Sequence, residues 1–165
     1  MPIDTKTAAR RELFVTSVDE LAGELDGLEA AMTSGSLTHT GNWTPGQIFD
    51  HCGKFMAFSY DGFPSKAPAP IRFVARLFFK KDAVNSDKPF PPGFKLPKQA
   101  SALLPSDAIS DADGLAVLRA QVVRWQAGER FEQMSPLLGP LTHDEWQTLH
   151  LKHCSMHMSF LHPGG

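Results

Sequence analysis

The chain has 165 residues, a length that favours a single domain over residues 1–165 with a hydrophobic core of its own. Apolar residues make up 42% of the sequence and charged residues 21%, which is ordinary for a soluble globular protein. The formal net charge of −2 provides no electrostatic attraction to nucleic acid or to an anionic membrane, so neither partner is expected.

Three further features favour a cytoplasmic protein. The two cysteines, Cys52 and Cys154, are too few for a disulfide framework and fit a reducing compartment. No apolar run approaches the ~20 residues that a transmembrane helix needs. The polar N-terminus lacks an apolar signal-peptide core, and residues 1–12 are expected to form a flexible or loosely packed segment.

The first two predicted helices begin at capping boxes, in which a serine or threonine and a residue three positions later satisfy free backbone groups. One box is Ser17–Glu20, and its helix is predicted to end before Gly35. The other is Thr44–Gln47, where Pro45 takes the first helical position and its missing N–H costs nothing. This second helix is predicted to run to about Tyr60.

A long proline-rich stretch follows, from about Asp61 to Ile109. Within it, Ile71–Lys80 predicts a short helix with one apolar and one basic face, whereas Phe90–Pro97 cannot form a regular helix. Amphipathic basic helices sometimes bind membranes. We interpret Ile71–Lys80 instead as a crossover helix that caps one end of the domain.

Two more helices complete the predicted fold. Ser110–Asp113 caps a helix that Gly128 ends, and Thr142–Glu145 opens a last helix that is predicted to run until Pro163. No segment alternates apolar and polar residues as a half-buried strand does. We therefore predict an all-α fold, a four-helix bundle with the proline-rich stretch as a long crossover between the second and third main helices.

The apolar face of the last predicted helix carries histidines. At about 100° per residue, His150, His153 and His157 fall on the same side as Trp146, and this side is predicted to point into the interior. The opposite side is predicted to face solvent and consists of Thr148, Lys152, Ser155 and Ser159.

The second predicted helix adds His51, which falls in its apolar stripe. Buried imidazoles need partners, and a shared divalent metal ion would satisfy several at once. The i, i+4 spacing of His153 and His157 lets both rings reach one ion. We interpret His51, His153 and His157 as a three-histidine metal site with an open position. His150 is either an alternative ligand to His153 or a residue that orients a ligand without binding the ion.

Less specific interpretations of these residues stay open. A lone core histidine is more often hydrogen-bonded and structural than metal-bound. Cys52 and Cys154 each follow a candidate ligand directly, and we expect small buried apolar side chains rather than ligands. Tyr60 and Asp61 either border the site or simply end the second helix; the second role is expected.

Four segments of the chain carry a resemblance to a known family: Asn42–His51, Pro92–Pro97, Gly139–Trp146 and Leu149–Leu161. Together they resemble the DUF1569 family, a branch of the DinB/YfiT-like superfamily of metalloproteins. The resemblance extends from about Arg11 to Pro163.

This resemblance implies a DinB-like four-helix bundle, often dimeric, with a bound divalent metal that is typically nickel or zinc. One ligand histidine on the second helix and a pair on the last correspond here to His51, His153 and His157. Characterised relatives include thiol S-transferases that use bacillithiol or mycothiol, and a mycothiol-dependent maleylpyruvate isomerase. The proline-rich insertion and the extra His150 depart from the common pattern, and the DUF1569 branch implies no particular substrate.

Two classes of function fit the sequence, which leaves open whether the protein is an enzyme. The first is a metal-dependent thiol S-transferase or hydrolase that acts on a small molecule or a low-molecular-weight thiol; its catalytic residues are unknown. The second is a non-enzymatic bundle whose histidines hold a structural metal or none, with Phe49, Phe55, Phe58 and the Phe63–Phe94 segment lining a small-molecule pocket or a dimer surface. A closed four-ligand site would favour the second class, and an open one the first.

Overall fold

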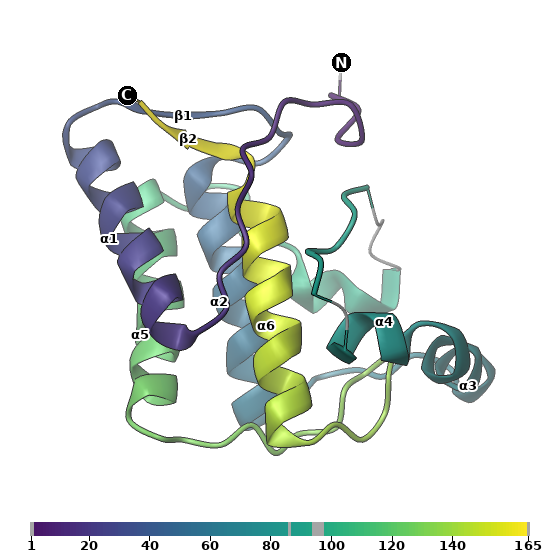
Figure 1. Ribbon diagram of the computed structural model, residues 1–165. Coiled ribbons are helices and arrows are strands. Elements are labelled where there is room, and N and C mark those ends of the chain that lie inside the picture. The colour runs from purple at the N-terminus through teal and green to yellow at the C-terminus, as the bar shows by residue number, and fades with distance from the viewer. Residues whose placement is uncertain (1, 86, 94–97, 165) are drawn as a thin grey trace.

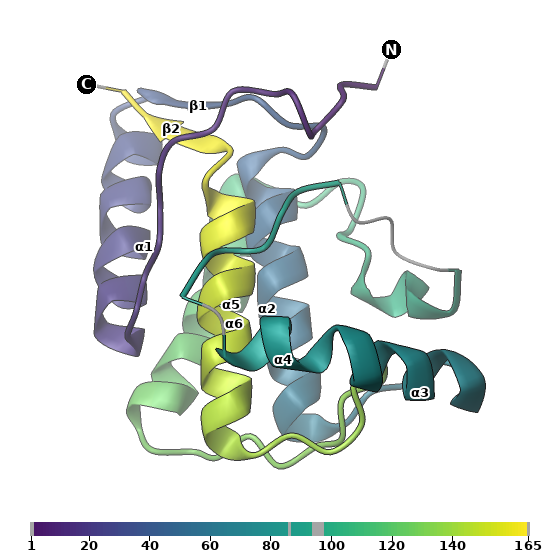
Figure 2. The same ribbon diagram turned by 45° about the vertical axis from the view of Figure 1, so that its right-hand side comes forward.

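Four long helices form the body of the protein in the computed structural model, which describes residues 2–85, 87–93 and 98–164. They run side by side (Figures 1 and 2) and are α1 (Val18–Thr33), α2 (Pro45–Asp61), α5 (Asp111–Gln126) and α6 (His143–Met158). The mainly helical character predicted from the sequence is confirmed. None of the helices in the described ranges has the length and apolar character needed to cross a bilayer.

The predicted starts of all four helices are confirmed by their caps. Hydroxyls at Ser17 and Ser110 accept hydrogen bonds from backbone N–H groups three residues later. Thr44 and Thr142 form complete capping boxes, because the side chain three residues on also accepts from the backbone of the cap. Local sequence therefore sets where each long helix begins.

The described part of the stretch between α2 and α5 contains three short helices: α3 (Ala69–Phe78), α4 (Lys80–Asn85) and the 3₁₀ helix η1 (Lys98–Leu103). The predicted helix at Ile71–Lys80 corresponds to α3. The α4 helix packs on α6, and η1 packs on α2. Residues 94–97, at the end of the stretch predicted to be non-helical, lie outside the described residues.

Helices α2 and α5 approach each other closely because glycine occupies the contact points. A Cβ atom added to Gly114 would lie 2.1 Å from the Gly46 carbonyl oxygen, and one added to Gly53 would lie 2.8 Å from Val117. The Gly46 N–H also donates to the Asp111 carboxylate at 2.8 Å, which joins the starts of the two helices. This close packing fixes α2, and with it His51, relative to the rest of the core.

The end of α6 differs from the prediction. The helix stops at Met158 rather than near Pro163, and residues Leu161–Pro163 form β2, which pairs antiparallel with β1 (Leu37–His39). Pairing with β1 gives these residues backbone partners that a helix containing Pro163 could not supply, since proline has no N–H. No strand was predicted here, because three residues are too few for a recognisable alternation.

The predicted solvent face of α6 was wrong for three of its four residues. Lys152, Ser155 and Ser159 are buried at 2%, 0% and 4% exposure. The N-terminal segment covers part of this face, since the Val15 N–H donates to Ser155 Oγ at 3.0 Å. Helix α4 covers another part, where the Lys152 ammonium donates to the Asp82 carbonyl. Polar residues can lie here because neighbouring backbone groups form hydrogen bonds with them.

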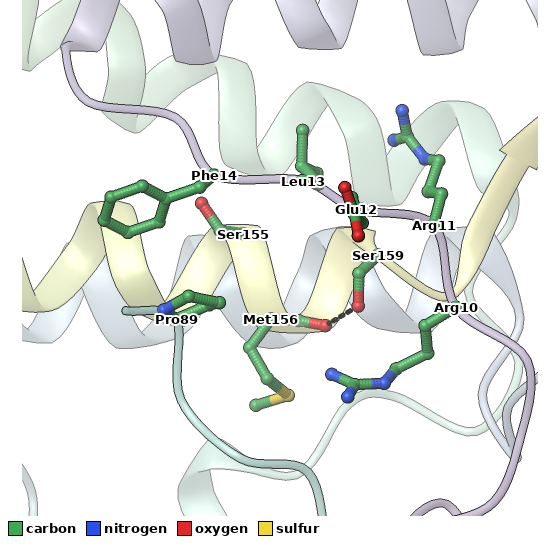
Figure 3. Close-up of a pocket in the computed structure, with 9 residues that line it drawn as sticks. All are labelled: Arg10, Arg11, Glu12, Leu13, Phe14, Pro89, Ser155, Met156 and Ser159. Carbon is green, nitrogen blue, oxygen red and sulfur yellow. Dashed lines mark hydrogen bonds between the residues drawn. The ribbon is translucent and has the colours of Figure 1, made fainter. Parts of the chain in front are cut away.

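A pocket of ≈ 440 Å³ lies along this covered face (Figure 3), where the N-terminal segment passes Ser155, Met156 and Ser159. The Arg11 backbone N–H donates to the Ser159 carbonyl at 3.0 Å, so the segment is tied to α6 at that point. The loose packing expected for residues 1–12 stays a prediction. Ser155 and Ser159 lie on the opposite side of the helix from His153 and His157, and none of the residues that line the pocket is a histidine.

Candidate metal centre

Helices α2 and α6 bring His51, His153 and His157 together. One ring nitrogen from each histidine lies within 4.8 Å of those of the other two, and the Nε2 atoms of His51 and His153 are 3.1 Å apart. Consecutive turns of α6 present His153 and His157, and α2 packs on α6 with His51 opposite them. The three residues predicted as ligands are therefore neighbours in the structure.

The orientation of His51 is set by a backbone acceptor. Its Nδ1 lies 2.6 Å from the Leu103 carbonyl oxygen in η1, and since a carbonyl can only accept, Nδ1 carries the proton. A neutral ring has one proton, so Nε2 presents a lone pair towards His153. This arrangement, a ring fixed through one nitrogen with the other free to bind, is typical of histidine ligands.

Aromatic rings hold the other two histidines. Trp43 stacks on His157 with ring centroids 5.5 Å apart and planes inclined by 17°, and it also contacts His51 at 4.9 Å. Phe55 packs against His153 at 4.8 Å. These flat, rigid contacts limit rotation of the imidazoles and keep their nitrogens directed at one another.

Electrostatics keep the three rings neutral. Burial lowers the pKa of His51, and it lowers the pKa values of His153 and His157 well below the ordinary value. A positive charge on a neighbouring histidine lowers the pKa values of His153 and His157 further. Neutral imidazole is the form that binds metal ions, so the cluster is in its binding form at neutral pH.

Neither an acid nor a thiol joins the three histidines within the described ranges. Burial alone would raise the pKa of Asp50, beside His51, but hydrogen bonds from Lys54 and Ser106 outweigh it and lower that pKa. The Asp50 carboxylate is thus ionised and engaged by Lys54 at 2.7 Å. Burial, together with a contact to the Cys154 thiol, raises the pKa of Cys52 well above its ordinary value. The apolar role expected for both cysteines agrees with their full burial.

His150 has a different set of partners. It is fully buried, its Nε2 lies 2.7 Å from Ser59 Oγ, and the Ser59 hydroxyl donates to the Met56 carbonyl at 2.6 Å. Because that hydroxyl proton is used, His150 Nε2 donates and its Nδ1 carries no proton. Burial lowers the pKa of His150 to about 3. The structure places His150 in an aromatic cage beside Trp146, outside the three-nitrogen group.

The prediction that three histidines occupy the centre of a buried stripe is confirmed for His150 but not for the other two. His153 and His157 are partly exposed, whereas Lys152 and Ser155 on the other side of α6 are buried. The covering segments lie over the polar side of α6, so the histidine side is the one that stays partly open. Access from solvent is what a site for a metal ion and a further ligand requires.

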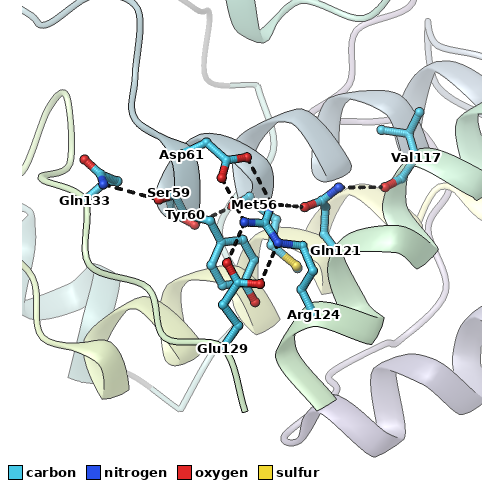
Figure 4. A network of polar contacts seen from close by, with 9 residues as sticks. All are labelled: Met56, Ser59, Tyr60, Asp61, Val117, Gln121, Arg124, Glu129 and Gln133. Atoms are coloured by element: carbon cyan, nitrogen blue, oxygen red, sulfur yellow. Dashed lines mark hydrogen bonds and ion pairs between the residues drawn. The ribbon is translucent and has the colours of Figure 1, made fainter. Parts of the chain in front are cut away.

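Tyr60 and Asp61 belong to another part of the molecule. Figure 4 shows the Arg124 guanidinium between the Asp61 and Glu129 carboxylates, with N–O distances of 2.8 Å and 2.6 Å. The same guanidinium lies over the Tyr60 ring at 4.2 Å, and Tyr60 stacks on Phe131. This network joins the ends of α2 and α5, in agreement with the helix-end role expected for both residues.

Two residues of the site were missed from sequence. Trp43 lies in Asn42–His51, the first of the segments that resemble the family. Its position just before the Thr44 cap indicates a contact with the start of α2, but it does not indicate the contact with His157 on α6. Leu103 acts through its backbone carbonyl, so its side-chain identity carries no signal for this role.

The chemistry of the cluster fits a metal ion. Among the described residues, only His51 of the three bonds to a partner other than a histidine, and its free Nε2 faces His153 Nε2. Zinc–nitrogen bonds of about 2.0–2.1 Å place two tetrahedral ligand nitrogens roughly 3.3 Å apart, close to the 3.1 Å between His51 and His153. Three imidazoles also match the borderline-soft ions, nickel and zinc, better than calcium or magnesium.

These observations define a mainly helical protein with a partly open three-histidine cluster between two helices. The chain belongs to the DUF1569 family, described as proteins of unknown function, whose model matches residues 7–164. No curated protein and no solved structure matches it.

Proposed function

We propose that this protein binds one divalent metal ion, nickel or zinc, through His51, His153 and His157, and uses it in a small-molecule transferase or hydrolase reaction. The single observation that carries the proposal is the convergence of three neutral ring nitrogens within 4.8 Å from two helices. The cluster has a partly exposed side and no acidic or thiol ligand among the described residues. Three protein ligands with an open position is the arrangement of catalytic zinc sites.

The wider DinB-like placement is part of the same proposal. A DinB-like four-helix bundle, with the 61–109 stretch as its long crossover, accounts for the four side-by-side helices and for ligands on the second and last of them. The resemblance adds a homodimer, and the few cysteines with the polar N-terminus add a cytoplasmic location. The observed order of the long helices supports this assignment.

The protein's own groups would perform three tasks. The Leu103 carbonyl holds the proton of His51 on Nδ1, so that Nε2 is free to bind. Trp43 and Phe55 fix the rings of His157 and His153. The partly exposed side of His153 and His157 admits a substrate. A divalent ion held there supplies positive charge that lowers the pKa of a thiol or a water molecule towards neutrality.

The small-molecule substrate is proposed to be a low-molecular-weight thiol or to react with one. Histidine-bound ions accept thiolates readily, and a deprotonated thiol is a strong nucleophile at neutral pH. The partly exposed ring of Phe55, which packs against His153, and that of Phe63 next to it would favour an apolar group on the other reactant.

Cobalt substitution tests both the ion and the open position. The apoprotein is titrated with Co²⁺, and its visible spectrum is recorded before and after addition of 2-mercaptoethanol as a probe thiol. We expect one ion per chain and a new sulfur-to-cobalt charge-transfer band when the thiol is added. His150→Leu serves as a matched control that should behave like the wild type.

The outcomes separate the proposed enzyme from a structural site. Azide is added as a second probe ligand. One bound ion whose spectrum changes with neither the thiol nor azide would indicate a closed structural centre and would contradict the catalytic proposal. No stoichiometric binding of cobalt, nickel or zinc would contradict the metal site itself and leave a non-enzymatic bundle.

A further inference from the structure

An unusual number of exposed apolar side chains lies on α3. Of the eleven large apolar residues exposed in the described part of the chain, six fall between Ile71 and Phe79. The aromatic ones are exposed most, with 69% for Phe73, 65% for Phe78 and 61% for Phe79. Scattered exposed leucines are normal in proteins, but a contiguous group of this kind marks a surface that another body covers.

The arrangement of these residues is that of an amphipathic helix. At about 100° per residue, Ile71, Phe73, Val74, Leu77 and Phe78 occupy an arc of roughly 160°, whereas Ala75, Arg72 and Arg76 occupy the other side. Ala75 is the one buried residue of α3. Both views show α3 at the edge of the molecule, away from the four long helices (Figures 1 and 2). The exposed fractions of its apolar residues show that the arc faces outwards. The expected capping role of this helix does not account for that arc.

The charge of this region is opposite to that of the remainder of the chain. Residues 62–93 contain six lysines and arginines and two aspartates, a net charge of +4. The other residues contain ten basic and sixteen acidic side chains, a net charge of −6. The whole-chain value of −2 averages over this separation, and it therefore hides a basic surface beside the apolar arc.

The basic side of α3 also has unused hydrogen-bonding capacity. Arg72 and Arg76 line a pocket of ≈ 200 Å³ together with Gly139 and Pro140. The Nε–H of Arg72 is buried and has no partner among the described residues. Guanidinium groups bind phosphate oxygens well, so this pocket suits an anionic phosphate group.

We propose that α3 binds the surface of an anionic phospholipid membrane, with its apolar arc in the boundary between headgroups and acyl chains. An amphipathic helix with aromatic residues on one face and arginines on the other binds in this way. The basic residues of the 62–93 segment add attraction to anionic headgroups. The acidic remainder of the chain is repelled from the same surface, and this fixes which side of the protein approaches it.

A second copy of the chain fits this surface less well. The ten residues of α3 form a helix about 15 Å long, and a face roughly 10 Å wide offers roughly 150 Å² of contact. Stable interfaces bury about 800 Å² on each partner. A symmetric contact through α3 would also bring two basic segments together. An anionic membrane avoids both problems. A short helix can insert into it without a large complementary surface, and its charge is opposite to that of the basic segment.

Vesicle co-sedimentation of the full chain tests this proposal. Vesicles of phosphatidylcholine mixed with phosphatidylglycerol should bind the wild type, and vesicles of phosphatidylcholine alone should bind it much less. The double variant Phe73→Ser/Leu77→Ser should bind at least about tenfold more weakly, since two apolar side chains no longer leave water. The matched control is Val123→Ser on α5, because Val123 is 61% exposed but lies outside the arc. This control should bind like the wild type, and added salt should weaken binding of both.

A fluorescence measurement keeps the test independent of the folding of the double variant. Phe78→Trp should show a blue shift when mixed vesicles are added, and Val123→Trp should not. Wild type that stays in solution with both vesicle types would overturn the proposal, as would binding that the double variant retains. A dimeric wild type and a monomeric double variant in light scattering, without vesicle binding, would instead assign α3 to a dimer interface.

Discussion

Helix α6 carries two kinds of histidine within three residues of each other, and they have opposite surroundings. His153 Nε2 lies 3.1 Å from the unprotonated Nε2 of His51, and His157 belongs to the same group. His150 donates to Ser59 at 2.7 Å inside an aromatic cage. The residue type and the helix are the same, and the difference comes from what α2 presents opposite each ring.

This comparison shows that burial does not by itself identify a metal ligand. His150 is fully buried, yet a single hydroxyl and ring contacts surround it. His153 and His157 are partly exposed and face other imidazoles. We therefore propose a structural role for His150 and a binding role for the other two, and this proposal leads to four predictions.

The largest effect should separate the two kinds of histidine in metal binding. His51→Ala, His153→Ala and His157→Ala should each weaken zinc binding at least about a hundredfold, because each removes one of three protein ligands. His150→Leu should keep zinc affinity within about threefold. Isothermal titration calorimetry measures both, with circular dichroism as the check on folding. Equal losses for His150→Leu and His153→Ala would remove the distinction.

The second effect is on stability in acid. The unfolded chain takes up a proton at His150 below about pH 6.5, whereas the folded protein does not do so until about pH 3. His150 therefore contributes a fall in the free energy of unfolding as the pH decreases through this window, and about 2 kcal/mol of that fall lies between pH 6.5 and pH 5. His150→Leu should lack this contribution. Urea unfolding of the metal-free proteins at the two pH values measures it, and parallel losses in both proteins would refute the structural assignment.

A smaller effect is expected from the ring that positions His157. Trp43→Ala should weaken zinc binding about tenfold, since residues that orient a ligand contribute at about this level. Trp43→Phe keeps a flat ring against His157 and serves as the control, with a change of a few-fold at most. Competition with a chelating dye gives both affinities. If Trp43→Ala binds zinc like the wild type, stacking does not position His157.

The smallest effect concerns the partner of His150. Ser59→Ala removes the acceptor of a buried N–H and should lower the free energy of unfolding by about 1 kcal/mol or more. Zinc affinity should not change, because Ser59 contacts the structural histidine only. Denaturant unfolding and calorimetry on the same samples check the two statements. A marked loss of zinc affinity would show that the two histidine environments are coupled.

Local sequence predicts much of the helical framework and the membership of the cluster. Caps at Ser17, Thr44, Ser110 and Thr142 mark the helix starts because capping depends on residues within one turn. Helical periodicity on α2 and α6 selected the three histidines that the structure brings together. Whether they bind metal stays a prediction.

Features that depend on distant segments were not predictable in the same way. The polar side of α6 is predicted from the sequence to face solvent, but residues 10–15 and α4 cover it. The Gly46–Gly114 contact joins residues far apart in sequence, and nothing local distinguishes these glycines from others. The outward apolar arc of α3 looks like a core-facing stripe until its place at the edge of the molecule is known.

The central claim is that His51, His153 and His157 hold one divalent ion. Crystals of the wild type grown with zinc and without chelator, measured on both sides of the zinc absorption edge, test it most directly. We predict a single strong anomalous peak among the three imidazoles, about 2.0–2.1 Å from each ligand nitrogen, with none beside His150. An anomalous map without a peak at the cluster, or with a peak bound by other residues, would contradict the claim.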